Sequence, residues 1–163
     1  MDEGFSEFAA GFDGPVLLVT AAAGGERGGC LVGFATQCSI EPVRFLVCLS
    51  KANRTFRVAA RAEMLGVHVL ERDDERQFEL ARLFGERTGD EIDKFARCAW
   101  TAGPGGVPLL EGVLRRMVGR VLERVDLGDH VGHVLAPVRI AVDGKGEPLG
   151  MTRVLHFAAG HLP

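Results

Sequence analysis

The segment from Gly33 to Thr55, GFATQCSIEPVRFLVCLSKANRT, places a polar loop on each side of a short apolar run. The whole chain has only three serines, two glutamines and one asparagine, and most of them fall in this segment, at Gln37, Ser39, Ser50 and Asn53. Uncharged polar side chains supply directed hydrogen bonds, so this concentration indicates either a binding site or two structured turns. Spacing alone leaves both interpretations open.

Length and composition exclude several classes of protein. The 163 residues suit one domain with a real core, and the net charge of −3 argues against a nucleic-acid partner, which would need a basic surface. No apolar run is long enough to cross a membrane. The first residues, MDEGFSEF, are acidic and lack the pattern of a signal peptide, so we expect a cytoplasmic protein.

The usual motifs of catalysis and metal binding are missing from the sequence. The four cysteines have no CxxC spacing, which indicates reduced structural thiols. His130 and His133 are three apart on an expected strand and would point to opposite faces, so we expect no metal site. No GxSxG, Walker A or Rossmann glycine motif occurs.

Hydrophobic patterning predicts a mainly β protein with short helices. Helices are expected at 55–62 and at 73–87, where Asp73 or Asp74 offers a cap. Apolar runs of strand length occur at 15–23, 30–36, 44–50, 64–70, 114–128, 130–142 and 150–157. The first two would form a hairpin with the longer loop GGERGG. Closing an antiparallel barrel would remove the sheet edges, and we expect a single domain over 1–163 with tails at 1–14 and 158–163.

Two polar clusters follow neighbouring strands and are the strongest candidate site. They comprise Thr36, Gln37, Cys38 and Ser39 after one strand, and Ser50, Lys51, Asn53, Arg54 and Thr55 after the next. If Thr55 caps the following helix, the helix N-terminus adds further donors for an anion. Hydroxyls, amides and two cations together suit a phosphate attached to a polar heterocycle.

The same segment, extended to Phe56, resembles the flavin-reductase-like members of the FMN-binding split-barrel families. Further matching motifs follow in order: MLGVHVL, QFELARLFG, the Asp93-Lys94-Phe95 loop, GGVPLLEG, LGDHVGHVLAPV and EPLGMTRVLHF, which contains Arg153. The resemblance extends from Pro15 to Phe157. The chain departs from the family pattern at Val43, where a second proline is usual, and at Asn53, where serine is frequent.

The resemblance implies a homodimeric, Greek-key-like split barrel that binds FMN or FAD near the dimer interface. Backbone donors of the Thr36–Ser39 loop would face the isoalloxazine, and Ser50, Lys51, Asn53, Arg54 and Thr55 would hold the ribityl chain and phosphate. Phe95 and Arg153, in the later motifs, would also contact the cofactor. NAD(P)H would be the co-substrate and would transfer hydride to flavin N5, which needs placement more than acid–base groups.

Several alternatives stay open at this stage. His130 would lie beside the nicotinamide, as the candidate catalytic residue, or merely open a strand. Reduced flavin would diffuse to a flavin-dependent monooxygenase, but an FMN-retaining redox protein and a non-catalytic flavin- or haem-binding module are rival interpretations. The sequence leaves open the choice between NADH and NADPH and between FMN and FAD.

Overall fold

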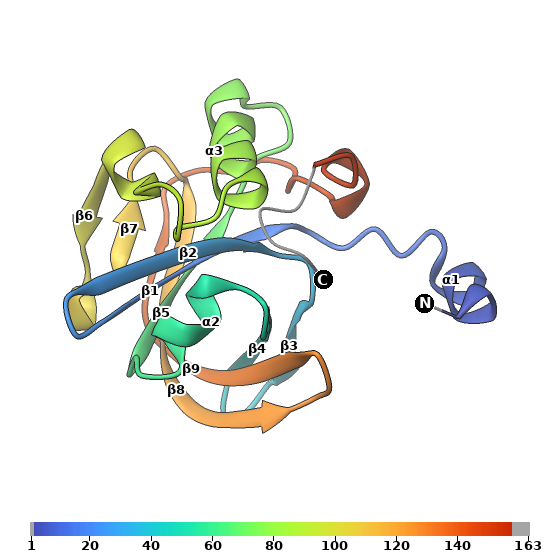
Figure 1. Cartoon of the computed structure of the whole chain (residues 1–163), viewed down its shortest axis with the longest axis horizontal. Helices are drawn as coiled ribbons and strands as arrows, with labels where there is room; N and C mark the ends of the chain where they lie inside the picture. Colours follow the sequence, from blue (N-terminus) through green and yellow to red (C-terminus); the bar gives the residue numbers. More distant parts are fainter. Residues whose placement is uncertain (1, 158–163) are drawn as a thin grey trace.

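The computed structural model describes residues 2–157 and consists mainly of antiparallel strands (Figure 1). The strands are β1 Leu17–Ala23, β2 Glu26–Val32, β3 Ala35–Ser39, β4 Arg44–Ser50, β5 Met64–Val69, β6 Trp100–Ala102, β7 Pro108–Leu110, β8 Arg115–Asp126 and β9 His130–Val142. Seven of them form one sheet in the order β2-β1-β5-β8-β9-β4-β3, and β6 pairs with β7. The predicted mainly β, antiparallel fold class is therefore confirmed.

The helices are short and lie around the sheet. They are α1 Glu3–Ala9, α2 Arg54–Ala59 and α3 Glu75–Glu86, with 3₁₀ turns η1 Lys94–Arg97, η2 Pro104–Gly106 and η3 Met151–Arg153. The Asp74 carboxylate accepts hydrogen bonds from the backbone N–H groups of Arg76 and Gln77 and caps α3, one of the two caps that the sequence suggested. Among residues 2–157, no helix has the length and apolar character needed to span a bilayer.

The hairpin of β1 and β2 is tighter than the sequence predicted. Ala23 pairs with Glu26, so the turn contains only Gly24 and Gly25, whose φ values are 57° and 79°. Two left-handed residues match the twist of a two-residue hairpin. The following glycines belong to the strand: a Cβ on Gly29 would lie 2.5 Å from the Phe84 ring of α3, so this position packs too closely for a side chain.

Strand β1 is buried on both faces, and each face contributes to a different apolar cluster. Leu17 and Val19 point into a cluster formed by β1, β2, β4, β5, β9 and α2. Leu18, on the other face, packs with Phe84 of α3 and with Leu149 near the C-terminus. The sheet therefore curves around one cluster and carries α3 and the C-terminal segment on its outside.

The prediction of a strand at 150–157 was wrong. The backbone N–H of Met151 donates to the carbonyl of Gly14 at 3.0 Å, and the Thr152 N–H and hydroxyl donate to the two Asp13 carboxylate oxygens at 3.0 Å each. With these bonds the segment forms the 3₁₀ turn η3 in place of the expected strand. Within the expected tail 1–14, residues 3–9 form α1, which has no buried residue and extends away from the sheet in Figure 1. Residues 158–163, the other expected tail, lie outside the described residues.

His68 on β5 is fully buried between two backbone groups. Its Nδ1 donates to the Leu18 carbonyl and its Nε2 accepts from the Leu110 N–H, both at 3.0 Å. Both bonds together require the neutral ring, because a protonated Nε2 could not accept. Burial lowers the pKa of His68 to about 4.

This environment predicts a loss of stability in mild acid. Below pH 6.5 the unfolded chain protonates His68 while the folded protein does not until about pH 4, so stability falls as the pH falls through this window. The expected loss is on the order of 3 kcal/mol. His68→Gln keeps a donor and an acceptor but does not titrate, and urea unfolding of both proteins between pH 7 and 4 should show a shallower decline for this variant. Equal declines would contradict the assignment.

Candidate functional site

A cavity of about 640 Å³ opens where β2, β4 and the β8–β9 turn come together. Its lining contains four of the residues that the sequence singled out, namely Ser50, Lys51, Asn53 and His130. The volume is typical of a site for a small organic ligand. The tertiary structure thus joins the second polar cluster to His130, which is 77 positions from Asn53 in the sequence.

Two cysteines form part of this lining. Burial raises the pKa of Cys30 to about 11 and also raises that of Cys48. Both are therefore neutral thiols near neutral pH and offer no thiolate nucleophile. Their contribution to the cavity is a small apolar surface.

Phe34 and His130 form an aromatic wall of the cavity. Their ring centroids are 5.1 Å apart with an interplanar angle of 58°, and Phe34 is 59% exposed. His130 Nδ1 lies 2.7 Å from a carboxylate oxygen of Asp129, and this hydrogen bond lowers the pKa of Asp129. Such a wall can pack against a planar ligand, and the carboxylate orients the imidazole.

Lys51 stands at the mouth of the cavity but already has a partner. Its ammonium lies 2.9 Å from Asp126, and the hydrogen bond lowers the pKa of that carboxyl. The side chains are 39% and 72% exposed, so the pair is solvated and contributes little to stability. A bound anion would have to compete with Asp126 for Lys51.

A second cavity of about 250 Å³ lies between the start of α2 and the end of α3. It shares Cys30, Leu31, Gly33, Asn53 and Met151 with the first cavity. The Asn53 side-chain oxygen accepts from the Thr55 N–H at 3.0 Å, so α2 is capped by Asn53 and not by Thr55. Thr55 lies inside the helix and is buried.

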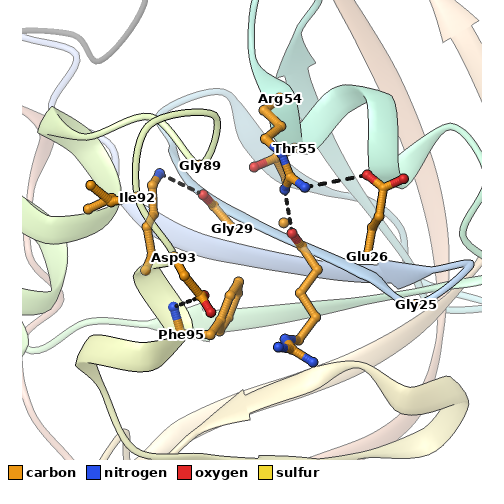
Figure 2. A pocket seen from close by; sticks show the side chains of 12 residues that line it. Gly25, Glu26, Gly29, Arg54, Thr55, Gly89, Ile92, Asp93 and Phe95 are labelled. Carbon is orange, nitrogen blue, oxygen red and sulfur yellow. Dashed lines mark hydrogen bonds and ion pairs between the residues drawn. The ribbon is translucent and has the colours of Figure 1, made fainter.

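Arg54, Thr55 and Phe95 line a third pocket, between β2 and the loop 89–95 (Figure 2). The Arg54 guanidinium donates to the Arg27 carbonyl at 2.6 Å and pairs with Glu26 and Asp90, both at 3.4 Å. Phe95 is 7% exposed and packs edge-on against Phe84. The charges of this pocket are thus largely compensated by one another.

Lys94 lines both the second and the third cavity. Its ammonium is buried and donates to the carbonyls of Gly29 and Phe84, both at 3.0 Å. Burial lowers the pKa of Lys94 to about 8. This cation has carbonyl partners but no carboxylate within ion-pair distance in the described part of the chain.

The first polar cluster lies outside all three cavities. Thr36, Gln37 and Cys38 are exposed on the edge strand β3, where Gln37 donates to the Ser39 carbonyl at 3.1 Å. Arg153 is exposed on η3. The two polar loops of the opening segment are therefore not gathered into one pocket of this chain.

Sequence reasoning missed Phe34, Arg87 and Met151. Gly33 and Phe34 were in the segment that drew attention, but an exposed phenylalanine carries no pattern of its own. Met151 is held at the cavity by long-range contacts, among them the bonds between η3 and residues 13–14. Among residues 2–157, no group of three or more histidine, cysteine or acidic residues is placed to hold a metal ion.

Comparison with known proteins identifies relatives over nearly the whole chain. The family model described as flavin reductase like domain matches residues 9–160. The reductase subunit HsaB of a flavin-dependent monooxygenase from Rhodococcus jostii is 38% identical over 106 residues, which cover 63% of this chain and 51% of that protein. The FMN reductase (NADH) RutF of Klebsiella pneumoniae is 27% identical over 147 residues, which cover 90% and 86% of the two chains.

Solved structures share the fold. The crystal structure of a flavin reductase domain protein from Arthrobacter sp. FB24 superposes with a TM-score of 0.79 at 25% identity, over 92% of this chain and 90% of that one. The chain spans about half the length of two of the curated relatives that it matches, the Rhodococcus subunit among them.

Proposed function

Since the chain belongs to the flavin reductase-like domain family, we propose that it transfers hydride from NAD(P)H to FMN or FAD. The observation that carries this proposal is the cavity of about 640 Å³ with an aromatic wall on one side and the Ser50–Asn53 loop on the other. Its size and mixed lining suit a planar heterocycle with a polar tail. A bound flavin supplies the hydride acceptor.

The residues of the cavity place the reactants, and the one imidazole–carboxylate pair of its lining, His130 with Asp129, is used here for packing and orientation. Phe34 and His130 offer a surface for packing the nicotinamide against the flavin, and Ser50 and Asn53 offer polar contacts to the flavin tail. The neutral thiols of Cys30 and Cys48 leave the ring side apolar. Hydride transfer depends on approach and orientation, so this lining supports the proposed reaction without a further acid or base.

Barrel closure and a homodimer belong to the same proposal. Leu127 is 54% exposed, and it lies beside Leu46 across Gly132, where a Cβ would meet the two leucines at 3.0 and 3.1 Å. This apolar surface adjoins the edge strand β3, which carries Thr36, Gln37, Cys38 and Ser39. If a second copy of the chain bound to this surface, the Thr36–Ser39 cluster of one subunit would lie closer to the cavity of the other subunit.

The reduced flavin would serve another enzyme. The Rhodococcus relative is the reductase subunit of a flavin-dependent monooxygenase, and a diffusing flavin needs only a site that binds and releases it. We therefore propose that a flavin-dependent monooxygenase consumes the product.

The decisive measurement is the oxidation of NADH and of NADPH by purified protein, with and without added FMN or FAD. A colourless protein that oxidises the nucleotide only when flavin is added is the expected result. A tightly bound yellow flavin without nucleotide oxidation would support a redox protein with another substrate. Absence of both flavin binding and oxidation would overturn the proposed function.

His130→Ala is expected to weaken the binding of NAD(P)H more than the binding of the flavin. Losing an aromatic contact of about 0.5–1.5 kcal/mol should raise the KM for NAD(P)H by about two- to tenfold. The flavin dissociation constant should change little. A lower melting temperature with an unchanged KM would instead show that His130 only shapes the turn into β9.

Leu127→Arg is expected to convert a dimer into a monomer, because it buries a charge in the proposed interface. Light scattering at micromolar concentration measures the mass directly. Leu155→Arg is the matched control, since Leu155 is 69% exposed and lies on the C-terminal segment, outside the proposed interface. A monomeric mass for the unchanged protein would contradict the proposed dimer.

A further inference from the structure

Met151 is one of five residues that the two cavities sharing Asn53 have in common. Met151 lines both the cavity of about 640 Å³ and the one of about 250 Å³. It rests on the backbone of Gly33, because a Cβ there would lie 2.6 Å from the Met151 sulfur and 2.9 Å from its terminal methyl. Of the five shared lining residues it has the longest flexible side chain, so we take it as the partition between the two cavities.

This partition can move without the backbone. The hydrogen bonds of Met151 and Thr152 to Gly14 and Asp13 hold η3 in place. The methionine side chain is unbranched and has three rotatable bonds, so it adopts other rotamers at low cost. Rotation away from Gly33 would join the two cavities.

The smaller cavity is chemically suited to an anion. Its lining includes Asn53, Arg87, Thr88 and Lys94, beside apolar residues such as Phe84. Within residues 2–157, no carboxylate lies at ion-pair distance from Arg87. Arginine can bind a phosphate through two parallel hydrogen bonds.

The neighbouring cations are less available. Lys51 pairs with Asp126 at 2.9 Å, and Arg54 pairs with Glu26 and Asp90 at 3.4 Å. Asp90, the carboxylate that contacts Thr88, is itself held by Arg57 at 2.7 Å. The excess positive charge around the two cavities therefore lies in the smaller cavity, at Arg87 and Lys94.

We propose that Met151 sets the flavin preference of this site by gating the smaller cavity, where Arg87 and Thr88 receive the phosphate of the flavin tail. The proposal rests on the proposed function and names residues that the sequence did not mark. The ring system occupies the larger cavity, and the tail passes Asn53 when the Met151 side chain moves off Gly33. FMN and FAD place their phosphate in the smaller cavity and therefore require the Met151 side chain to move. Riboflavin lacks the phosphate and binds without entering the smaller cavity.

The first test compares FMN and riboflavin by fluorescence titration, which reads binding without turnover. Arg87→Ala should weaken FMN binding by about tenfold or more, because one charge-assisted hydrogen bond is lost, and should leave the affinity for riboflavin unchanged. Lys51→Ala is the matched control and should affect the two flavins alike. If Lys51→Ala removes the preference for FMN and Arg87→Ala does not, the phosphate lies at Lys51 and the proposal is overturned.

The second test changes the gate. Met151→Phe places a stiff ring at the partition and should reduce FMN affinity to that of riboflavin, while Met151→Ala should keep the preference for FMN. Met151→Leu, of similar volume, checks that the segment still folds, through an unchanged melting curve. Retained FMN preference in Met151→Phe, or equal weakening of both flavins, would overturn the gating role.

The outcome also separates this inference from the function on which it rests. If the unchanged protein binds neither riboflavin nor FMN, the proposed function itself fails. If it binds both flavins with equal affinity and oxidises NAD(P)H, the function stands and only the assignment of Arg87 and Met151 is wrong.

Discussion

The ammonium of Lys94 joins β2 to the end of α3 inside the protein, and the shape of the candidate site depends on this bridge. It donates to the carbonyls of Gly29 and Phe84 at 3.0 Å each. A buried cation is costly unless its donors are satisfied, and the two charge-assisted bonds offset that cost. They also satisfy a carbonyl in the last turn of α3, where intrahelical donors run out.

This bridge requires a close contact between α3 and β2, and the glycines of β2 make it possible. With no side chain on Gly29, the Phe84 ring packs directly on the strand, and Phe95 packs edge-on against Phe84 with centroids 5.4 Å apart. The end of α3 then stands near the start of α2. The smaller cavity is the space that remains between these two helices and η3.

Several features of the fold follow from local patterns. The apolar runs at 44–50 and 64–70 coincide closely with β4 and β5, and the helix at 73–87 contains α3 with its Asp74 cap. These elements are correctly predicted because an apolar run of strand length and a capped amphipathic helix are both local signals. The glycines at 24–29 were misread as a long loop, because glycine signals both a turn and a close packing contact, and only the tertiary neighbours of Gly29 distinguish the two.

The sequence by itself determined the mainly antiparallel β architecture and the polar cluster of Ser50, Lys51 and Asn53 at the end of β4, because strand patterns and turn chemistry are local properties. Only the tertiary structure decided which partners these residues have. The pairing of Lys51 with Asp126, the wall of Phe34 and His130, and the seat of Met151 on Gly33 all join segments far apart in the chain. Such contacts depend on strand order and on how the ends of the chain are bound, and no local pattern encodes them.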